Sequence, residues 1–244
     1  LHEVDGISGV SGGSFTAAYY GLFGDRIFED FDQKFLKKNV QGGLTRRLLL
    51  RPDNWVRLFS PFFQRSDLAA EYYDKILFEK KTFRDMEARK GQSPMVHINA
   101  TDMVTGIRVA FHQDAFDILC SDLSSYPVAR AVTASSAVPV VLTPITLRNY
   151  SNDCGFTLPK EIERIRREHD ISSRSFHQVS NVDVYQDVAK HKYIHLVDGG
   201  VSDNLGLRAA LDRILALGNF WNTLKYLKLE NTRKVVIIVV NAET

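Results

Sequence analysis

The sequence has little of the residue types that build specialised scaffolds. Its 244 residues include only 2 cysteines, 7 prolines and 15 glycines, which excludes a disulfide-dense scaffold, a four-cysteine zinc module and a collagen-like or disordered chain. The longest apolar run, 235–240, is too short to span a bilayer. The 31 Lys and Arg residues almost balance the 29 Asp and Glu residues. A net charge of +2 gives no global attraction to nucleic acid, so we expect no such partner.

The pattern of apolar residues predicts one α/β domain over residues 1–244. Helical segments alternate with short buried strands, which favours a mainly parallel sheet with helices on both faces. A helix is also expected after Ser66-Asp67, which resembles an N-cap, and the polar run 170–178 is expected to be a loop. The other expected helices are 12–22, 28–38, 127–137, 160–168 and 204–217, and the expected strands are 4–8, 95–101, 107–113, 193–197 and 235–240.

Residues 9–13 read Gly-Val-Ser-Gly-Gly and match the Gly-x-Ser-x-Gly pattern of a nucleophile elbow. Such a serine projects its hydroxyl from a cramped strand-to-helix turn, where side chains larger than glycine at 9 and 13 would collide. The amide of Gly12 and the N-terminus of the following helix would then face a developing oxyanion. A glycine-rich turn that binds nothing has the same pattern. Because a helix is expected directly after the motif, we predict that Ser11 is a nucleophile.

Asp198 is the candidate base. It follows the apolar strand 193–197 and precedes Gly199 and Gly200, so its carboxylate is expected at an edge of the sheet, with room for a hydroxyl or substrate to approach. An ordinary Asp-Gly turn is the plainer interpretation. Aspartate is a weaker base than histidine, so a Ser-Asp pair needs a dehydrated pocket and a close hydroxyl contact.

A Ser-His-Asp triad that uses His191 or His195 is the alternative. No histidine follows Asp198, His195 lies inside an expected strand and His191 lies just before it. These positions differ from the loop that holds the histidine in a serine, acid, histidine order. Their spacing also does not favour a metal site, so we expect neither a metal nor a cofactor.

Together, the 9–13 motif and Asp198-Gly199-Gly200 resemble the patatin-like phospholipase family. Supporting stretches are Asn-Ala-Thr-Asp at 99–102 and Ala-Val-Thr-Ala-Ser-Ser-Ala-Val-Pro at 131–139. The resemblance covers residues 1 to about 208 and implies a three-layer α/β/α sandwich with a mainly parallel central sheet. It implies Ser11 as nucleophile, Asp198 as base and hydrolysis of acyl esters in lipids through an acyl-enzyme. A catalytically silent binding protein with the same fold is a further alternative.

The sequence departs from the family at its start. Patatin-like proteins carry a glycine-rich, basic oxyanion loop upstream of the elbow, and no such loop precedes Gly6. Because the chain begins with Leu1 instead of Met, we expect an upstream segment that holds this loop, where any export signal or lipid anchor would also lie. The alternative is that the protein lacks a full oxyanion hole. Loss of one oxyanion donor costs about 2.7–4 kcal/mol of transition-state stabilisation. The 244 residues alone are therefore expected to hydrolyse esters more slowly than a longer chain.

Residues 44–65 carry five arginines and one acid, Asp53. Arginines interleaved with aromatic residues suit an anionic lipid surface, where each basic residue adds about 1 kcal/mol. We therefore expect residues 40–66 to be a lid or an interfacial insertion and expect peripheral membrane association. In the alternative, the aromatics pack inward and the arginines are merely solvated. The candidate interface residues are Arg46, Arg47, Arg51, Trp55, Arg57, Phe62 and Phe63, with Phe59 and Arg65 beside them.

The two cysteines, Cys120 and Cys154, could form one bridge. Unless the protein is exported, we expect them to be free thiols.

Overall fold

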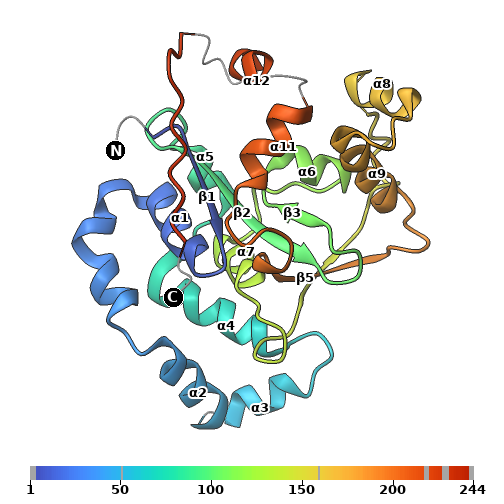
Figure 1. Cartoon of the computed structure of the whole chain (residues 1–244). Helices are drawn as coiled ribbons and strands as arrows, with labels where there is room; N and C mark the ends of the chain where they lie inside the picture. The colour runs from blue at the N-terminus through green and yellow to red at the C-terminus, as the bar shows by residue number, and fades with distance from the viewer. Residues whose placement is uncertain (1–3, 51, 159, 217–219, 227–230, 242–244) are drawn as a thin grey trace.

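The computed structural model describes residues 4–50, 52–158, 160–216, 220–226 and 231–241. A five-stranded sheet lies at its centre, flanked by helices (Figure 1), as expected for an α/β sandwich. The strand order is β1-β2-β5-β4, and β3 pairs with β2 off this path. The strands are β1 Gly6–Val10, β2 Met95–Asp102, β3 Arg108–Ala110, β4 Ile145–Arg148 and β5 Tyr193–Asp198.

The helices differ in length and in kind. Three short segments are of 3₁₀ or π type: η1 Gly24–Arg26, η2 Ile27–Leu36 and η3 Asp74–Phe78. The α-helices are α1 Gly12–Phe23, α2 Val40–Leu50, α3 Pro52–Leu58, α4 Arg65–Tyr73, α5 Phe83–Glu87, α6 Gln113–Ile118, α7 Val128–Ser135, α8 Lys160–Glu168, α9 Arg174–Gln186, α10 Gly200–Asp203, α11 Arg208–Ala216 and α12 Phe220–Tyr226.

The sheet is mixed, so the expectation of a mainly parallel sheet is wrong. Among the described strands, only β1 and β2 pair in parallel; the β2–β3, β2–β5 and β4–β5 pairings are antiparallel. A short turn through Gly106, at φ 71°, joins β2 to β3 and forces them to run in opposite directions. The helices between β4 and β5, α8 and α9, pack on each other and on α6 and α11. They do not form the sheet-covering crossover that a parallel pair requires.

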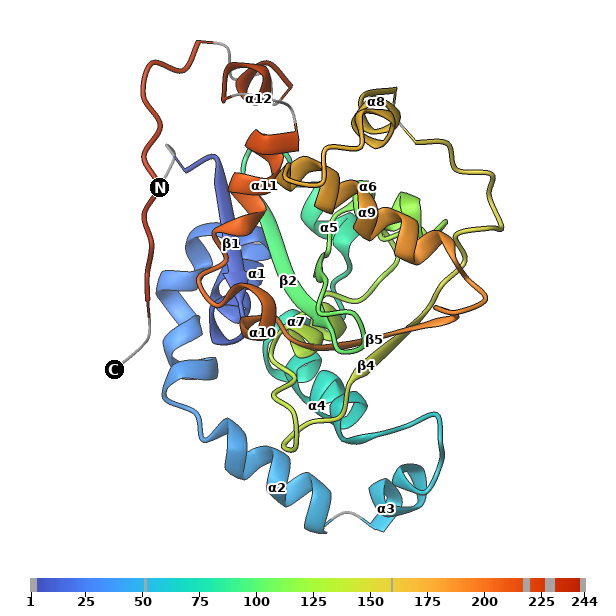
Figure 2. The ribbon, with the colours of Figure 1, turned by 45° about the vertical axis from the view of Figure 1, so that its right-hand side comes forward.

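Alternation along β2 separates the two faces of the sheet. Val96, Ile98 and Ala100 belong to the apolar core, which α1 and α7 also line. The intervening Asn99 and Thr101 carry polar contacts to the side of α10 and α11. Figures 1 and 2 show α10 and α11 across β2 from α1 and α7. The sheet therefore presents an apolar face to one helical layer and a polar face to the other.

Small residues let α1 pack closely on the sheet. Ala17, Ala18 and Tyr19 are buried. A Cβ at Gly21 would lie 2.7 Å from Val96 Cγ2 on β2, which no real side chain tolerates. Helix α1 therefore packs directly against β2.

Most expected elements are present, with shifted ends. Strands 95–101 and 193–197 and helix 160–168 are confirmed, whereas strand 4–8 begins and ends two residues later and helix 127–137 is shorter, with Pro127 as its N-cap. Helix α4 begins after Gln64, which closes a capping box with Asp67, so Ser66 is inside the helix. One expectation was wrong: α9 begins at Arg174, within the loop expected at 170–178. The helix expected at 204–217 is present as α11 with a later start, and the short helix α10 precedes it.

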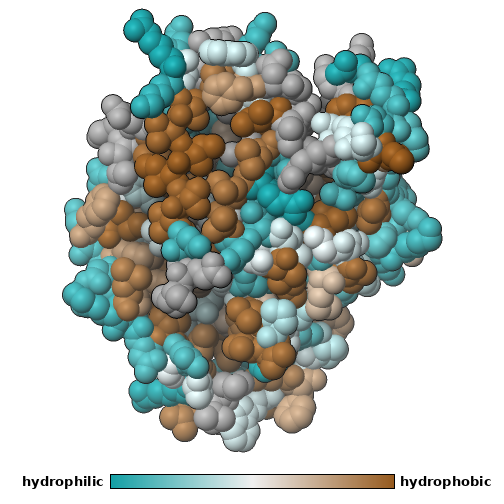
Figure 3. Space-filling view, viewed as in Figure 1, coloured by the Kyte–Doolittle hydropathy of each residue, from teal (hydrophilic) through white to brown (hydrophobic). Residues whose placement is uncertain are grey.

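Residues 235–240 do not form the expected buried strand. They lie in the extended, exposed segment 231–241, outside the sheet. Figures 1 and 2 show this segment, in red, running along the β1 side of the molecule, and Figure 3 shows apolar surface there. The β-branched side chains favour extended backbone, but no described strand pairs with this segment.

A disulfide joins Cys120 and Cys154, so the expectation of free thiols is wrong. Their Cα atoms lie 5.5 Å apart because the loop after α6 meets the loop after β4. None of the described helices combines the length and the apolar character needed to cross a membrane.

Candidate active site

Ser11 stands on the turn between β1 and α1. Its backbone has φ 50° and ψ −124°, a conformation that a residue with a side chain adopts only under strain. The strand ends at Val10 and the helix begins at Gly12, so the turn is one residue long. The predicted nucleophile elbow requires a strained strand-to-helix turn of this kind.

The flanking glycines of the elbow are not equivalent. A Cβ at Gly9 would lie 2.8 Å from Ser14 Cα and 3.0 Å from Ala17 Cβ, so the predicted collision is confirmed there. A Cβ at Gly13 would meet nothing within 4 Å, so the predicted collision at this position is wrong. Only Gly9 is enclosed, because α1 folds back over the end of β1.

Asp198 ends β5, and its side chain is buried, at 7% exposure. Its Oδ1 atom accepts a hydrogen bond of 2.8 Å from the amide of Gly200. Its Oδ2 atom is buried and has no hydrogen-bond partner among the described residues. A buried polar atom without a partner costs stability and marks a place where a further donor belongs.

Strands β1 and β5 approach each other head to head along β2. Strand β1 pairs with Met95–Asn99, and β5 pairs in the opposite direction with Ala100–Asp102. Strand β3 takes the other edge of β2 at this point, so β1 and β5 share one edge. The last residues of the two strands, Val10 and Asp198, therefore lie beside neighbouring residues of β2.

Gly199 allows this close approach. A Cβ at this position would collide with the Asn99 carbonyl oxygen and would lie 3.1 Å from Val10 Cγ1. At Gly200, a Cβ would lie 3.0 Å from Asp198 Oδ1. The two glycines thus bring the Asp198 turn against β2 and the elbow. The structure brings Ser11 and Asp198 to the same junction.

The C-terminus of α7 contacts both loops, which the sequence did not reveal. The carbonyl oxygen of Ser135 accepts the amide of Ser11 at 3.1 Å and that of Gly199 at 3.0 Å. The next carbonyl but one, at Ala137, accepts the amide of Asp198 at 3.0 Å. The only signal in the sequence was the run of small residues at 131–137, which allows such close contact.

A series of polar contacts on the polar face of β2 also supports the turn that holds Ser11. Asn99 Nδ2 donates to the carbonyl oxygen of Gly9 at 3.0 Å, and Asn99 Oδ1 accepts from Arg108 at 2.8 Å. Arg108 also pairs with Asp212 on α11 at 3.1 Å. These contacts connect α11 to the elbow across the polar face of β2. No sequence pattern indicated them, because the residues come from four elements.

The first turn of α1 offers unused donors. Among the described residues, the amides of Gly12 and Gly13 have no hydrogen-bond acceptor, as is usual for the first N–H groups of a helix. They lie directly after Ser11 and at the positive end of the helix dipole. This arrangement can stabilise negative charge beside the Ser11 hydroxyl.

The histidines of the alternative triad lie elsewhere. His195 Nδ1 is 2.9 Å from Thr146 Oγ1 on β4, and the alternation of β5 directs His195 to the face opposite Asp198. His191 lies in the loop before β5. Neither ring hydrogen-bonds to Asp198. Within the described part of the chain, no cluster of three His, Cys, Asp or Glu side chains could hold a metal ion.

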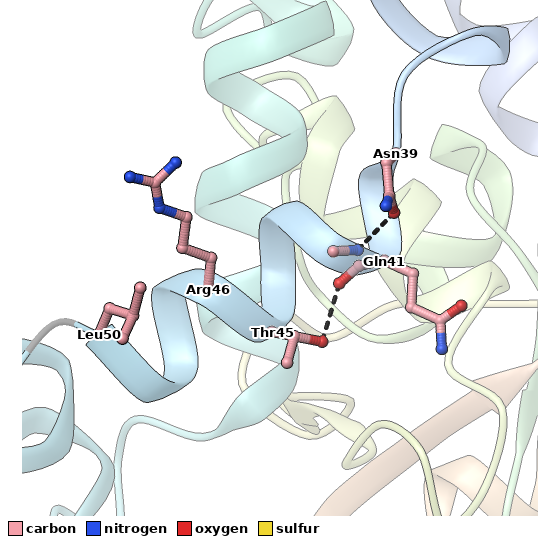
Figure 4. A pocket seen from close by; sticks show the side chains of 6 residues that line it. Asn39, Gln41, Thr45, Arg46 and Leu50 are labelled. Atoms are coloured by element: carbon pink, nitrogen blue, oxygen red, sulfur yellow. Dashed lines mark hydrogen bonds between the residues drawn. The ribbon is translucent and has the colours of Figure 1, made fainter.

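Helices α2 and α3 form an arm that projects from the sheet (Figure 1). Phe59 and Phe62 are almost fully exposed, at 90% and 92%, and Trp55 is half exposed. Arg46 lines a shallow pocket on α2 (Figure 4), where Arg46 and Thr45 leave the helix on different sides. Phe59 and Phe62 therefore present their rings to solvent.

Other candidates in this segment have internal partners. The Arg57 guanidinium lies 3.8 Å from the centre of the Phe63 ring and pairs with Glu71, whose hydrogen bond raises the pKa of Arg57. Arg47 lies 4.8 Å from the centre of the Tyr72 ring. These three side chains therefore fasten the arm to α4, so Arg47 and Arg57 are not merely solvated, contrary to what the alternative interpretation expected. Arg51 lies outside the described residues.

The fold and the junction define the class of the protein: an α/β sandwich whose candidate site lies at the ends of neighbouring strands. The chain belongs to the patatin-like phospholipase family, whose model matches residues 1–211. No curated protein and no solved structure matches the chain. Membership in the family supports lipid ester hydrolysis in general, with a lipid as substrate.

Proposed function

We propose that the protein is a serine acyl hydrolase that cleaves lipid esters, of the phospholipase A or lipase type, with Ser11 as nucleophile and Asp198 as base. The observation that carries the proposal is the buried, unpartnered Asp198 Oδ2 at the junction where the strained Ser11 stands. Asp198 Oδ2 lacks a hydrogen-bond donor, and the Ser11 hydroxyl could supply one. Ester cleavage in turn requires a base that accepts the proton of the serine.

The proposed reaction has two halves. Asp198 takes the proton of Ser11 Oγ as this oxygen attacks the ester carbonyl, and the Gly12 and Gly13 amides receive the oxyanion. The tetrahedral intermediate expels the alcohol, which takes the proton from Asp198, and leaves an acyl-enzyme. A water molecule then gives its proton to Asp198 and attacks the acyl group. The fatty acid leaves and Ser11 regains its proton.

Substitution at both positions tests the proposal. In the complete protein, Ser11→Ala and Asp198→Asn are expected to lower kcat for a short acyl ester by about 10³-fold or more, with the fold retained. Asp203→Asn is the matched control, because Asp203 is equally buried at 7% but binds the amide of Arg208. A comparable loss with His195→Gln would instead support the triad. Absence of hydrolysis in the parent protein would support a silent binding protein.

We further propose that the α2–α3 arm docks on an anionic lipid surface. Trp55, Phe59 and Phe62 are the exposed aromatics, and Arg46 and Arg65 are exposed cations beside them. Aromatic rings insert at the level of the lipid headgroups, while arginines attract anionic lipids. The lid interpretation and the interfacial one are compatible, because the arm follows the helix after the nucleophile.

Vesicle binding tests the arm. The double variant Phe59→Ser/Phe62→Ser is expected to reduce co-sedimentation with phosphatidylserine vesicles by about tenfold or more, and Arg46→Gln/Arg65→Gln to weaken it by several-fold at low salt only. Phe28→Ser is the control, because Phe28 is exposed but lies on η2, outside the arm. Equal binding by the Phe59/Phe62 double variant and the control variant would contradict the proposal.

A further inference from the structure

Ser135 is the last residue of α7, and it is fully buried, with an exposed fraction of 0%. It lies at the junction of β1, β2 and β5, where the strand ends that carry Ser11 and Asp198 meet. A fully buried hydroxyl at such a place needs partners for its donor and its acceptor capacity.

The hydroxyl of Ser135 is saturated. It donates to the Asn99 carbonyl oxygen at 2.6 Å, so its contact of 2.6 Å with Ser14 Oγ is one that Ser14 donates. The amide of Ser11 is the second donor to this oxygen, at 3.1 Å. A hydroxyl has one donor and two acceptor positions, and all three are used.

The amide of Ser11 thus has two acceptors on one residue, Ser135 Oγ and Ser135 O, each at 3.1 Å. The same carbonyl oxygen also receives the amide of Gly199, which follows Asp198. One residue therefore holds the strained elbow and the aspartate turn at a fixed separation. Buried groups restrained in this way can hold a reacting pair in near-attack geometry.

We propose that Ser135 is a positioning residue, which sets the approach of the Ser11 hydroxyl to Asp198 without touching the substrate. The inference rests on the proposed dyad. Ser135→Ala removes the hydroxyl that accepts the Ser11 amide and leaves the carbonyl oxygen that holds the amides of Ser11 and Gly199. The elbow then loses one of its two restraints, so kcat is expected to fall while KM stays almost unchanged, because the substrate-binding surface is intact.

Two hydroxyls, one on α7 and one at its C-cap, provide matched controls. Thr133 is equally buried at 0%, and its hydroxyl bonds to the Ala129 carbonyl oxygen at 2.7 Å. Ser136 Oγ bonds to the Val132 carbonyl oxygen at 2.8 Å. Both bonds stay within α7 and its C-terminal end, so their loss affects the helix but not the junction.

The kinetic test compares Ser135→Ala with Thr133→Val and Ser136→Ala in the complete protein. Ser135→Ala is expected to lower kcat for a short acyl ester by about tenfold to a hundredfold, to leave KM within about twofold, and to slow labelling of Ser11 by a fluorophosphonate by a similar factor. The two control variants are expected to keep kcat. A Ser135→Ala enzyme that loses stability like Thr133→Val but keeps kcat would overturn the inference.

If the Ser135→Ala variant does not fold, hydrogen exchange in the parent protein provides a second test. The amides of Ser11 and Gly199 are expected to be protected from hydrogen exchange at least as strongly as the buried amides of β2, because both bond to Ser135. Rapid exchange of these two amides would overturn the inference. If the parent hydrolyses no ester, the proposed function fails by itself, and the exchange result still decides whether Ser135 holds the two loops.

Discussion

At the residue scale, the two outer glycines of the elbow make opposite predictions. Gly9→Ala forces a Cβ against α1, so we expect it to destabilise the protein by about 1–3 kcal/mol and to remove most activity. Gly13→Ala adds a methyl group to open space in the first turn of a helix, so we expect stability to stay equal or to rise by about 0.5–1 kcal/mol. Urea unfolding of both variants measures the difference. Equal destabilisation would contradict the asymmetry.

Local sequence motifs indicated the candidate residues Ser11 and Asp198. The elbow and the Asp198 turn are short patterns whose glycines follow from nearby backbone. The contacts of Ser135, Asn99 and Arg108 were not predicted, because their hydrogen bonds join residues far apart in the sequence. A buried serine in a run of small residues looks like any other packing position until the fold brings its partners together.

At the element scale, acidic groups hold η2 against α1 and the end of η3. Asp30 on η2 bonds to Tyr19 on α1 and pairs with Arg26 and Lys34, while Glu79 also pairs with Arg26. Burial opposes ionisation of Asp30, but the hydrogen bonds from Lys34, Tyr19 and Arg26 outweigh it and lower its pKa from 3.8 to about 2.

This shift predicts how stability depends on pH. Between about pH 4 and pH 2 the unfolded chain binds a proton at Asp30 that the folded protein does not, so stability falls as pH falls through this range. Asp30→Asn is expected to flatten this part of the curve of unfolding free energy against pH. Urea titrations at several pH values provide the comparison. Parallel curves for the variant and the parent would contradict the prediction.

Element types were predicted better than strand directions. The pattern of apolar and charged residues predicted β2 and β5 as strands and α7 and α8 as helices. Alternation does not encode which way a strand runs, so the mixed sheet was not predicted. The direction of β5 depends on α8 and α9 packing away from the sheet, which is a long-range property.

At the scale of the whole molecule, the exposed apolar segment 235–240 is a surface that favours self-association. Its β-branched side chains stand in extended backbone without a partner strand, which favours intermolecular strand pairing. Ile238→Lys is expected to reduce concentration-dependent association, measured by analytical ultracentrifugation. Phe28→Lys, at an exposed apolar site elsewhere, is the control. Identical association of both variants would contradict the prediction.

Because β1 and β5 pair head to head along β2, the length of β2 sets the distance between their ends. One continuous strand of eight residues, Met95–Asp102, sets the spacing between the serine turn and the aspartate turn. An inserted or deleted residue in its middle would change that spacing by about one strand rise, roughly 3.3 Å, and would also exchange the two faces beyond it. We therefore expect family members that use this pair of residues to tolerate changes in the arm and the loops, but to keep the length of this strand.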